Sequence, residues 1–297
     1  MKNIFAFKFG NERTKAVVFL ILASVFWSSA GILIKLVHWN PVAIAGTRSL
    51  IASLVVLLYL RKPKITWSKP QVGGALAYTT TVILFVTANK LTTAANAILL
   101  QFTSPVFVAL LGVWILKERI RWFDWVTIAV VFGGMTLFFL DNVGAGSMLG
   151  NVLAVISGFF IACVTVALRC QKDGSPVETT LLGNLLTVVV ALPFILRAGL
   201  PDMRSIIGLI LLGVFQLGCA YIFYALAVKN LTALEAILIS VIEPLLNPLW
   251  VFLFAGEKPS LLAVIGGIIV LASVTIRNIV VTKKFSVVKE DCTNADC

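Results

Sequence analysis

The stretch TAANAILLQFTSPVFVALLGVWILKE, residues 93–118, decides the fold, because TALEAILISVIEPLLNPLWVFLFAGE, residues 232–257, repeats it 139 positions later. Eight of the 26 positions are identical without a gap. The shared residues are Thr93, Ala94, Ala97, Ile98, Leu99, Pro105, Leu110 and Glu118, matched by Thr232, Ala233, Ala236, Ile237, Leu238, Pro244, Leu249 and Glu257. Self-similarity at a fixed period indicates that the chain is a duplicated unit.

The duplicated unit has the composition of a membrane protein. Hydrophobic residues make up 60% of the chain and charged residues 12%, and the mean hydropathy is +1.02, whereas a soluble domain carries about 25% charged residues. Apolar runs of about 17 to 25 residues predict membrane-spanning helices, and these runs lack the alternation of barrel strands. Ten such runs occur, at residues 16–37, 41–60, 71–89, 93–115, 123–140, 148–168, 178–196, 205–228, 232–255 and 261–281.

The basic residues are unevenly distributed between the loops. If the N-terminus lies in the cytoplasm, 18 Lys and Arg residues fall on inner segments and four on outer ones, while Lys35 and Arg48 lie within apolar runs. This bias predicts a multi-pass protein of the cell (inner) membrane with both termini cytoplasmic and a first helix that is retained. The net charge of +11 therefore reflects topology, and we expect no nucleic-acid partner.

Each repeat contains five apolar runs, and this odd number gives the two repeats opposite orientations in the membrane. The predicted parts are a cytoplasmic segment 1–15, a first repeat 16–141, a second repeat 148–281 and a cytoplasmic tail 282–297. Because five is odd, the second repeat enters the membrane from the other side. We expect an all-α membrane protein of ten helices, two inverted five-helix repeats (5+5). This architecture is typical of secondary transporters that work by alternating access.

Four segments carry a family resemblance: SVFWSSAGILIKL (24–36), PVAIAGTR (41–48), TSPVFVALLGVWILKERI (103–120) and IEPLLNPLWVFLFAGEKPS (242–260). In order, spacing and duplication they resemble the drug/metabolite transporter superfamily, and more narrowly its EamA-type ten-helix members. The resemblance covers residues 16–281 and implies export of amino acids, related metabolites or drugs. Other branches carry sugar nucleotides or phosphorylated sugars, so an exchanger of such solutes is the alternative.

The sequence departs from this family in its first helix and between its halves. The family commonly has Trp-Gly in the first helix, whereas here Trp27 is followed by Ser28. In the second repeat, Gly158 lies near the position equivalent to Trp27, and Asn184 lies near the position equivalent to Arg48. The two halves are therefore no longer chemically symmetric.

Two prolines occupy equivalent places in the repeated stretch. Pro105 and Pro244 lie near the middle of their runs, where a proline cannot donate a hydrogen bond to the carbonyl four residues earlier. The freed carbonyls belong to Gln101 and Ser240, and Pro248 adds a second break. Two helix kinks with free acceptors predict a place for a polar substrate group, unless the prolines only shape helix packing.

Charged residues inside apolar runs are the strongest site candidates. A carboxylate as deep as Glu243 is costly, so we expect it to bind substrate, to carry a coupling proton or to anchor the kink. Arg48 lies about 10 Å into its helix. It is a counter-ion for Glu243 or for a substrate carboxylate, or else a hydrogen-bond hub for free carbonyls. Lys35, near a helix end, can extend to the interface instead.

Polar amides and aromatic residues in the runs complete the candidate translocation site, although each can also be packing. They are Trp27, Tyr78, Asn96, Gln216, Tyr221 and Asn247. Glu235 fits a capping box with Thr232, while Glu118 and Glu257 are expected to be interfacial anchors or parts of a gate.

Several kinds of chemistry find no support in the sequence. No phosphate loop is present, so transport is expected to use a substrate or proton gradient. Five dispersed cysteines and one histidine indicate neither a metal site nor a cofactor. A membrane-embedded enzyme is a remote alternative, because no catalytic constellation has suitable spacing. A receptor or structural partner is also disfavoured. We expect a monomer that binds a small molecule, with protons as a candidate coupling ion.

Overall fold

The computed structural model describes residues 11–140, 147–171, 175–246 and 261–294. Within these ranges the chain forms helices and no strand. The elements of the first half are α1 (Glu12–Trp27), α2 (Ala30–Leu36), α3 (Pro41–Leu60), α4 (Lys69–Leu91), α5 (Ala94–Gln101), α6 (Ser104–Leu111), η1 (Gly112–Leu116) and α7 (Trp122–Phe139). Those of the second half are α8 (Met148–Cys170), α9 (Pro176–Arg197), α10 (Met203–Leu211), η2 (Leu212–Cys219), α11 (Ala220–Ala227), α12 (Ala233–Ile239) and α14 (Leu261–Asn294).

Seven helical stretches in the described residues are long and apolar enough to cross a membrane. They are Glu12–Leu36, Pro41–Leu60, Lys69–Leu91, Asn96–Leu116, Met148–Cys170, Pro176–Arg197 and Met203–Ala227. Shorter apolar helices cover Trp122–Leu137 and Val264–Arg277, and the run 232–255 is described only as far as residue 246. The all-helical membrane character is confirmed, and the ten-helix 5+5 arrangement stays a prediction.

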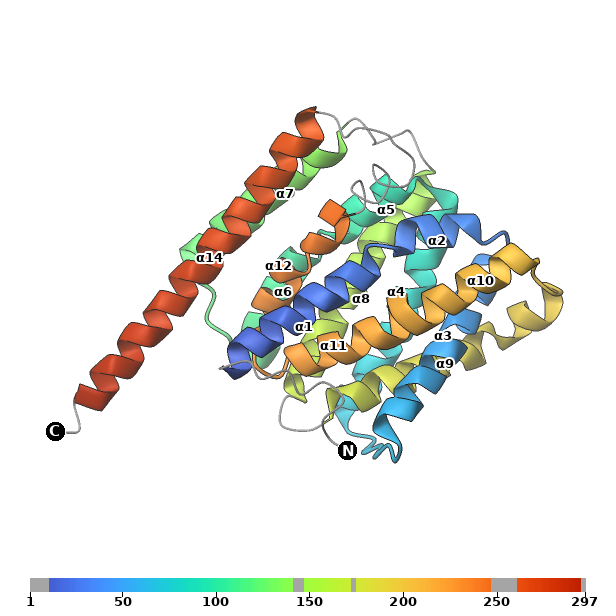
Figure 1. Cartoon of the computed structure of the whole chain (residues 1–297), viewed down its shortest axis with the longest axis horizontal. Coiled ribbons are helices and arrows are strands. Elements are labelled where there is room, and N and C mark those ends of the chain that lie inside the picture. The colour runs from blue at the N-terminus through green and yellow to red at the C-terminus, as the bar shows by residue number, and fades with distance from the viewer. Residues whose placement is uncertain (1–10, 141–146, 172–174, 247–260, 295–297) are drawn as a thin grey trace.

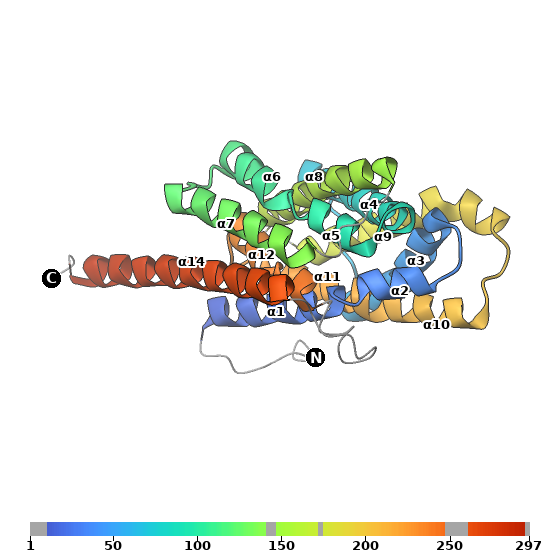
Figure 2. The ribbon, with the colours of Figure 1, turned by 90° about the horizontal axis from the view of Figure 1, so that it is seen from above.

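Helices of the two halves pack against one another throughout the bundle. Helix α4 lies between α8 and α9, α3 contacts α9 and η2, and α1 lies along α11. Helices α7 and α14 form a pair at one side of the bundle (Figures 1 and 2). The interior is therefore built from both halves, and a cavity at its centre takes side chains from each.

Three of the helical stretches are interrupted in the interior of the bundle. The first breaks at Ser28 and Ser29, whose hydroxyls donate to the carbonyls of Val25 and Phe26. The second breaks between α5 and α6, just before Pro105. The third breaks after α12 at Ser240 and Val241, just before Pro244, and helical backbone resumes at 242. A proline lacks the N–H that would donate a helical hydrogen bond, and a serine hydroxyl competes for a backbone carbonyl. These breaks therefore have a local cause in the sequence.

Two helical stretches change their pitch, at the π-helix η1 that follows α6 and at η2. Between α10 and α11 the backbone widens into the π-helix η2, a rare geometry that is frequent at functional sites. Gly213 in η2 lies so close to α3 that an added Cβ would lie 2.5 Å from Cβ of Ile51 and 2.9 Å from the carbonyl oxygen of Arg48. The absence of a side chain at Gly213 therefore lets α3 and η2 approach closely.

Candidate functional site

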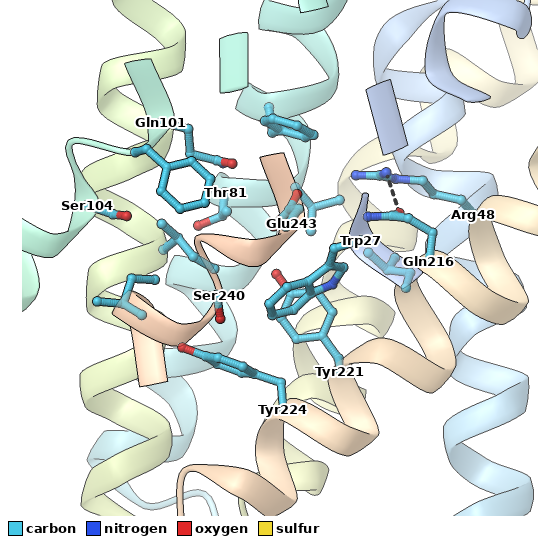
Figure 3. A pocket seen from close by; sticks show the side chains of 16 residues that line it. Trp27, Arg48, Thr81, Gln101, Ser104, Gln216, Tyr221, Tyr224, Ser240 and Glu243 are labelled. Atoms are coloured by element: carbon cyan, nitrogen blue, oxygen red, sulfur yellow. Dashed lines mark hydrogen bonds between the residues drawn. The ribbon is translucent and has the colours of Figure 1, made fainter. Parts of the chain in front are cut away.

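A narrow cavity lies where the interrupted helices meet (Figure 3). It offers a space of about 60 Å³ to water-sized molecules, which is less than the roughly 150 Å³ of a cavity that holds benzene. A metabolite therefore needs the surrounding helices to move apart. The lining residues are Trp27, Arg48, Thr81, Val82, Phe85, Gln101, Phe102, Ser104, Ile161, Gln216, Leu217, Tyr221, Tyr224, Ile237, Ser240 and Glu243.

The cavity brings together most of the site residues that the sequence predicts. Those that line it are Trp27, Arg48, Gln101, Gln216, Tyr221, Ser240 and Glu243. Tyr78 lies behind the wall, with its ring 4.7 Å from that of Tyr221. Asn96 lies elsewhere, in a hydrogen-bonded cluster with Thr92. Asn247 and Pro248 lie outside the described residues.

Several lining residues are absent from the sequence prediction. Tyr224 packs its ring 5.0 Å from that of Trp27 and shares a hydrogen bond with Thr165. Thr81, Phe85, Phe102 and Ser104 also line the cavity. Tyr224 is three residues after Tyr221, and Thr81 is three residues after Tyr78. Residues three apart lie on the same face of a helix, so Tyr224 and Thr81 could have been predicted from their spacing to Tyr221 and Tyr78.

Arg48 is almost entirely buried, with 1% of its surface exposed. Its Nη1 donates to Oε1 of Gln216 over 3.0 Å, which links α3 to η2 (Figure 3). Its Nε is buried without a hydrogen-bond partner, and in the described part of the chain no ion pair joins it to a carboxylate. Neither the predicted pairing with Glu243 nor bonds to free carbonyls occur among these residues.

Glu243 lines the same cavity from the broken helix that follows α12 (Figure 3). It is partly exposed to the cavity, and its backbone N–H donates to the carbonyl of Ser240 over 2.9 Å. In the described ranges no ion pair involves its carboxylate. The cavity thus contains one cationic and one acidic side chain that are not paired with each other.

The carbonyl freed by Pro105 is held against a neighbouring helix. An added Cβ on Gly158 of α8 would lie 2.7 Å from the carbonyl oxygen of Gln101. The side-chain amide of Gln101 donates to Oγ of Ser157, also in α8, over 3.0 Å. The break between α5 and α6 is therefore packed on α8, and the polar side chain of Gln101 remains at the cavity wall.

At the end of the bundle predicted to face outward, lysines bond to backbone carbonyls. Lys35 donates to the carbonyl of Thr92 over 2.9 Å, and Lys90 donates to that of Val37 over 2.6 Å. The hydroxyl of Thr92 donates to Asn151 over 2.8 Å and accepts from Asn96 over 3.2 Å. This cluster connects α2, α4, α5 and α8.

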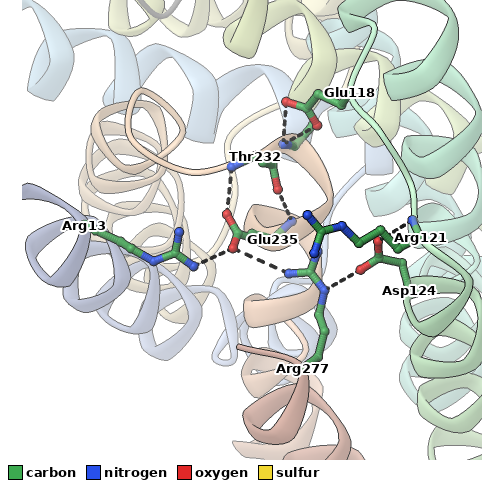
Figure 4. A network of polar contacts seen from close by, with 8 residues as sticks. Arg13, Glu118, Arg121, Asp124, Thr232, Glu235 and Arg277 are labelled. Atoms are coloured by element: carbon green, nitrogen blue, oxygen red, sulfur yellow. Dashed lines mark hydrogen bonds and ion pairs between the residues drawn. The ribbon is translucent and has the colours of Figure 1, made fainter. Parts of the chain in front are cut away.

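At the other end, the predicted cytoplasmic one, ion pairs surround the start of α12 (Figure 4). Oε1 of Glu235 lies 2.6 Å from Nη2 of Arg13 and 3.7 Å from Nη1 of Arg277. Nε of Arg277 in turn lies 2.9 Å from Oδ1 of Asp124. These contacts join α1, α7, α12 and α14.

The predicted capping box of Glu235 with Thr232 is confirmed, because each side chain bonds to the other's backbone N–H. Glu118 extends this end by accepting from the N–H of Ala233 over 3.2 Å and from Nε of Arg169 over 3.3 Å. Burial raises the pKa of Glu118, against the opposing effects of Arg169 and the Ala233 amide. Glu257, the repeat counterpart of Glu118, lies outside the described residues.

The family model described as the EamA-like transporter family matches residues 14–140 and 148–279, which covers both halves of this arrangement. The chain belongs to the EamA-like transporter family. As a member of this family it is a multi-pass protein of the lipid bilayer that binds a small-molecule substrate. Its predicted membership of the drug/metabolite transporter superfamily is confirmed.

Relatives extend over most of the length of this EamA-like chain. An uncharacterized transporter of Archaeoglobus fulgidus is 27% identical over 280 residues, covering 88% of this chain and 96% of the relative. The uncharacterized transporter YdfC of Bacillus subtilis is 28% identical, covering 91% and 94%. The pseudopaline exporter CntI of Pseudomonas aeruginosa is 27% identical, covering 86% and 93%. These names describe transporters and not enzymes.

A solved structure shows the same fold. A crystal structure with 18% sequence identity superimposes with a TM-score of 0.74 and covers 88% of this chain and 97% of its own. At this identity the likeness concerns the fold alone.

Proposed function

We propose that this EamA-like transporter is a secondary active exporter of amino acids or related small metabolites and drugs. It works by alternating access around the central cavity, in the cell membrane and as a monomer. The observation that carries the proposal is the cavity itself, where Arg48 and Glu243 face a common space between interrupted helices. Broken helices that place polar groups near the middle of the membrane are typical of secondary transporters.

The chemistry of the cavity favours a small polar solute. Arg48 and Glu243 provide a positive and a negative group, and Trp27, Tyr221 and Tyr224 provide aromatic surface. The name of the relative CntI, an exporter, supports the outward direction. The small size of the cavity supports alternating access, because a solute can enter only after one end has opened.

A phosphorylated-metabolite or sugar-nucleotide exchanger remains the second candidate. A phosphate monoester brings about 1.5 to 2 negative charges at neutral pH. The cavity, however, contains one guanidinium and a carboxylate among its described lining residues. This balance favours a solute with less negative charge.

The test is efflux from proteoliposomes loaded with a mixture of amino acids, nucleosides, sugar phosphates and cationic dyes. The purified, folded protein is expected to release amino acids or related small solutes faster than protein-free vesicles do. A second set of vesicles carries a sugar phosphate on both sides, so that an exchanger can be recognised. Efflux of sugar phosphates alone, or of no solute in either set, would contradict the proposal.

The same vesicles test whether protons drive transport. An imposed pH gradient is expected to accelerate efflux through the wild type, because Glu243 offers a carboxylate in the cavity that can take up a proton. Glu243→Gln is expected to abolish this acceleration. Acceleration that persists in the folded variant would show that Glu243 has a structural role at the helix break.

A further inference from the structure

We propose that Arg48 recognises a carboxylate of the transported solute and that Gln216 positions the guanidinium for this contact. The inference rests on the proposed transport function and narrows its substrate class to zwitterions and monoanions. Cationic drugs and dyes are then not substrates. Four features of the described residues lead to this assignment.

The first feature is the unused hydrogen-bonding capacity of Arg48. A guanidinium has five N–H donors, and the hydrogen bond from Nη1 to Gln216 is the one that Arg48 makes within the described chain. Nε is buried without a partner, and the side chain as a whole is 1% exposed. A buried charge without a counter-ion is strongly destabilising. A ligand that supplies the missing negative charge removes this cost.

The second feature is that the equivalent contact in the other half is neutral. By sequence, Asn184 of α9 lies near the position that matches Arg48. Tyr78 donates to Oδ1 of Asn184 over 3.0 Å, and Nδ2 of Asn184 donates to the carbonyl of Thr180 over 2.9 Å. Neutral, satisfied groups are thus sufficient to join these helices. The positive charge at Arg48 needs another explanation than packing.

The third feature is that the partner of Arg48 is an amide. Gln216 orients the guanidinium through one hydrogen bond and leaves its charge uncompensated. The π-helix η2 holds Gln216, and the close approach at Gly213 keeps η2 against α3. A guanidinium held in place by one hydrogen bond, with its other donors unused among the described residues, is suited to binding a carboxylate.

The fourth feature is the surroundings of Arg48. The phenols of Tyr78 and Tyr221 lie near it, and Glu243 lines the same cavity. Glu243 makes no ion pair in the described ranges, so it is free to accept an ammonium group from the same solute. A zwitterion offers a carboxylate to Arg48 and an ammonium group to Glu243, and it adds no net charge to the middle of the membrane.

The decisive variant is Gln216→Glu. The substitution keeps the size of the side chain and the hydrogen bond to Arg48, and it supplies the negative charge that the solute would otherwise bring. If Arg48 has a structural role, the new ion pair between Arg48 and the introduced carboxylate leaves transport intact or raises the thermal stability of the protein. If Arg48 binds a carboxylate, the variant folds but no longer recognises it. Gln71→Glu is the matched control, because Gln71 is also buried but lies outside the cavity, and its Oε1 already accepts the backbone N–H groups of Thr66 and Trp67, which stabilise a carboxylate.

The assay compares efflux of the twenty standard amino acids, as a mixture, with efflux of the corresponding amino-acid amides. We expect the wild type to prefer the acids by at least about tenfold, which corresponds to about 1.4 kcal/mol. Gln216→Glu should lose this preference and reduce efflux of the acids by a similar factor, while Gln71→Glu stays close to the wild type. Equal efflux of acids and amides, or unchanged efflux through Gln216→Glu, would overturn the inference.

A binding measurement separates this inference from the transport proposal. The amino-acid mixture is expected to raise the thermal midpoint of the purified wild type more than the amide mixture does, and not to do so in Gln216→Glu. If vesicles show no efflux but this pattern is found, transport is wrong and carboxylate recognition stands. Equal or absent stabilisation in the wild type would contradict recognition of a carboxylate by Arg48.

Discussion

Glu235 shows how a single carboxylate can serve two structural purposes. It lies in the first turn of α12, and its side chain completes the capping box with Thr232. The same carboxylate pairs with Arg13 of α1 and Arg277 of α14. Sequence spacing was sufficient to predict the capping box, because that motif is local. The arginine partners, 222 residues away in the case of Arg13, could not be predicted from spacing.

The variant Glu235→Gln separates the two purposes. Glutamine is accepted in a capping box, so the start of α12 is kept while both ion pairs are lost. Arg277 is buried and Arg13 is partly exposed. We therefore expect the free energy of unfolding to fall by about 2 kcal/mol, which lies between the values for surface and buried ion pairs. The thermal midpoint of the purified protein measures this loss.

Glu12→Gln is the control for that variant. Glu12 is 72% exposed and lies 3.9 Å from Lys15, and such surface pairs contribute about 0.5 kcal/mol or less. Its thermal midpoint is expected to match that of the wild type. Equal midpoints for Glu235→Gln and Glu12→Gln would show that the ion pairs at the end of α12 do not stabilise the protein.

At the scale of whole elements, apolar runs predict helices well because a helix must satisfy its backbone within the membrane. The runs 41–60 and 148–168 coincide closely with α3 and α8. The prolines correctly marked where α5 and α12 end. No such local signal marks the π-helix η2, which packs against α3, a distant part of the chain.

The packing of η2 on α3 can be tested at Gly213. In Gly213→Ala the new methyl group would lie 2.5 Å from Cβ of Ile51, so the two helices must move apart, and overpacking of this kind costs about 1 to 3 kcal/mol. Because Arg48 and Gln216 lie on these two helices, we expect a lower thermal midpoint together with loss of amino-acid efflux.

Gly73→Ala provides the comparison for Gly213→Ala. Gly73 lies within α4, and nothing would lie within 4 Å of an added Cβ. Alanine in a helix interior is favoured over glycine by roughly 0.5 to 1 kcal/mol. The variant is expected to keep its efflux and to unfold at the same or a higher temperature. Loss of efflux in both variants would mean that the contact at Gly213 has no special importance.

For the molecule as a whole, the cavity was only partly predictable. Arg48 and Glu243 were identifiable because ionisable groups are costly inside a membrane. The partners of Arg48 were not, since the bond to Gln216 spans 168 residues and depends on how the halves pack. Asn96, a polar residue in an apolar run, lies in the cluster with Thr92 instead. Burial of a polar group therefore indicates a partner, but not whether that partner is a solute.

The inverted relation of the halves can be tested by the accessibility of two equivalent loops. Lys62 follows α3, and Leu200, which is 99% exposed, follows α9, the corresponding helix of the second repeat. With 18 basic residues on the predicted inner segments and four on the outer ones, the loop at Leu200 should face outward and that at Lys62 inward.

Single cysteines are placed at each position in a chain without its five native cysteines. A membrane-impermeant maleimide is expected to label Leu200→Cys in intact cells, and Lys62→Cys only after permeabilisation. Labelling of both loops from the same side would mean that the repeats are parallel, and alternating access could then not follow from an exchange of roles between them.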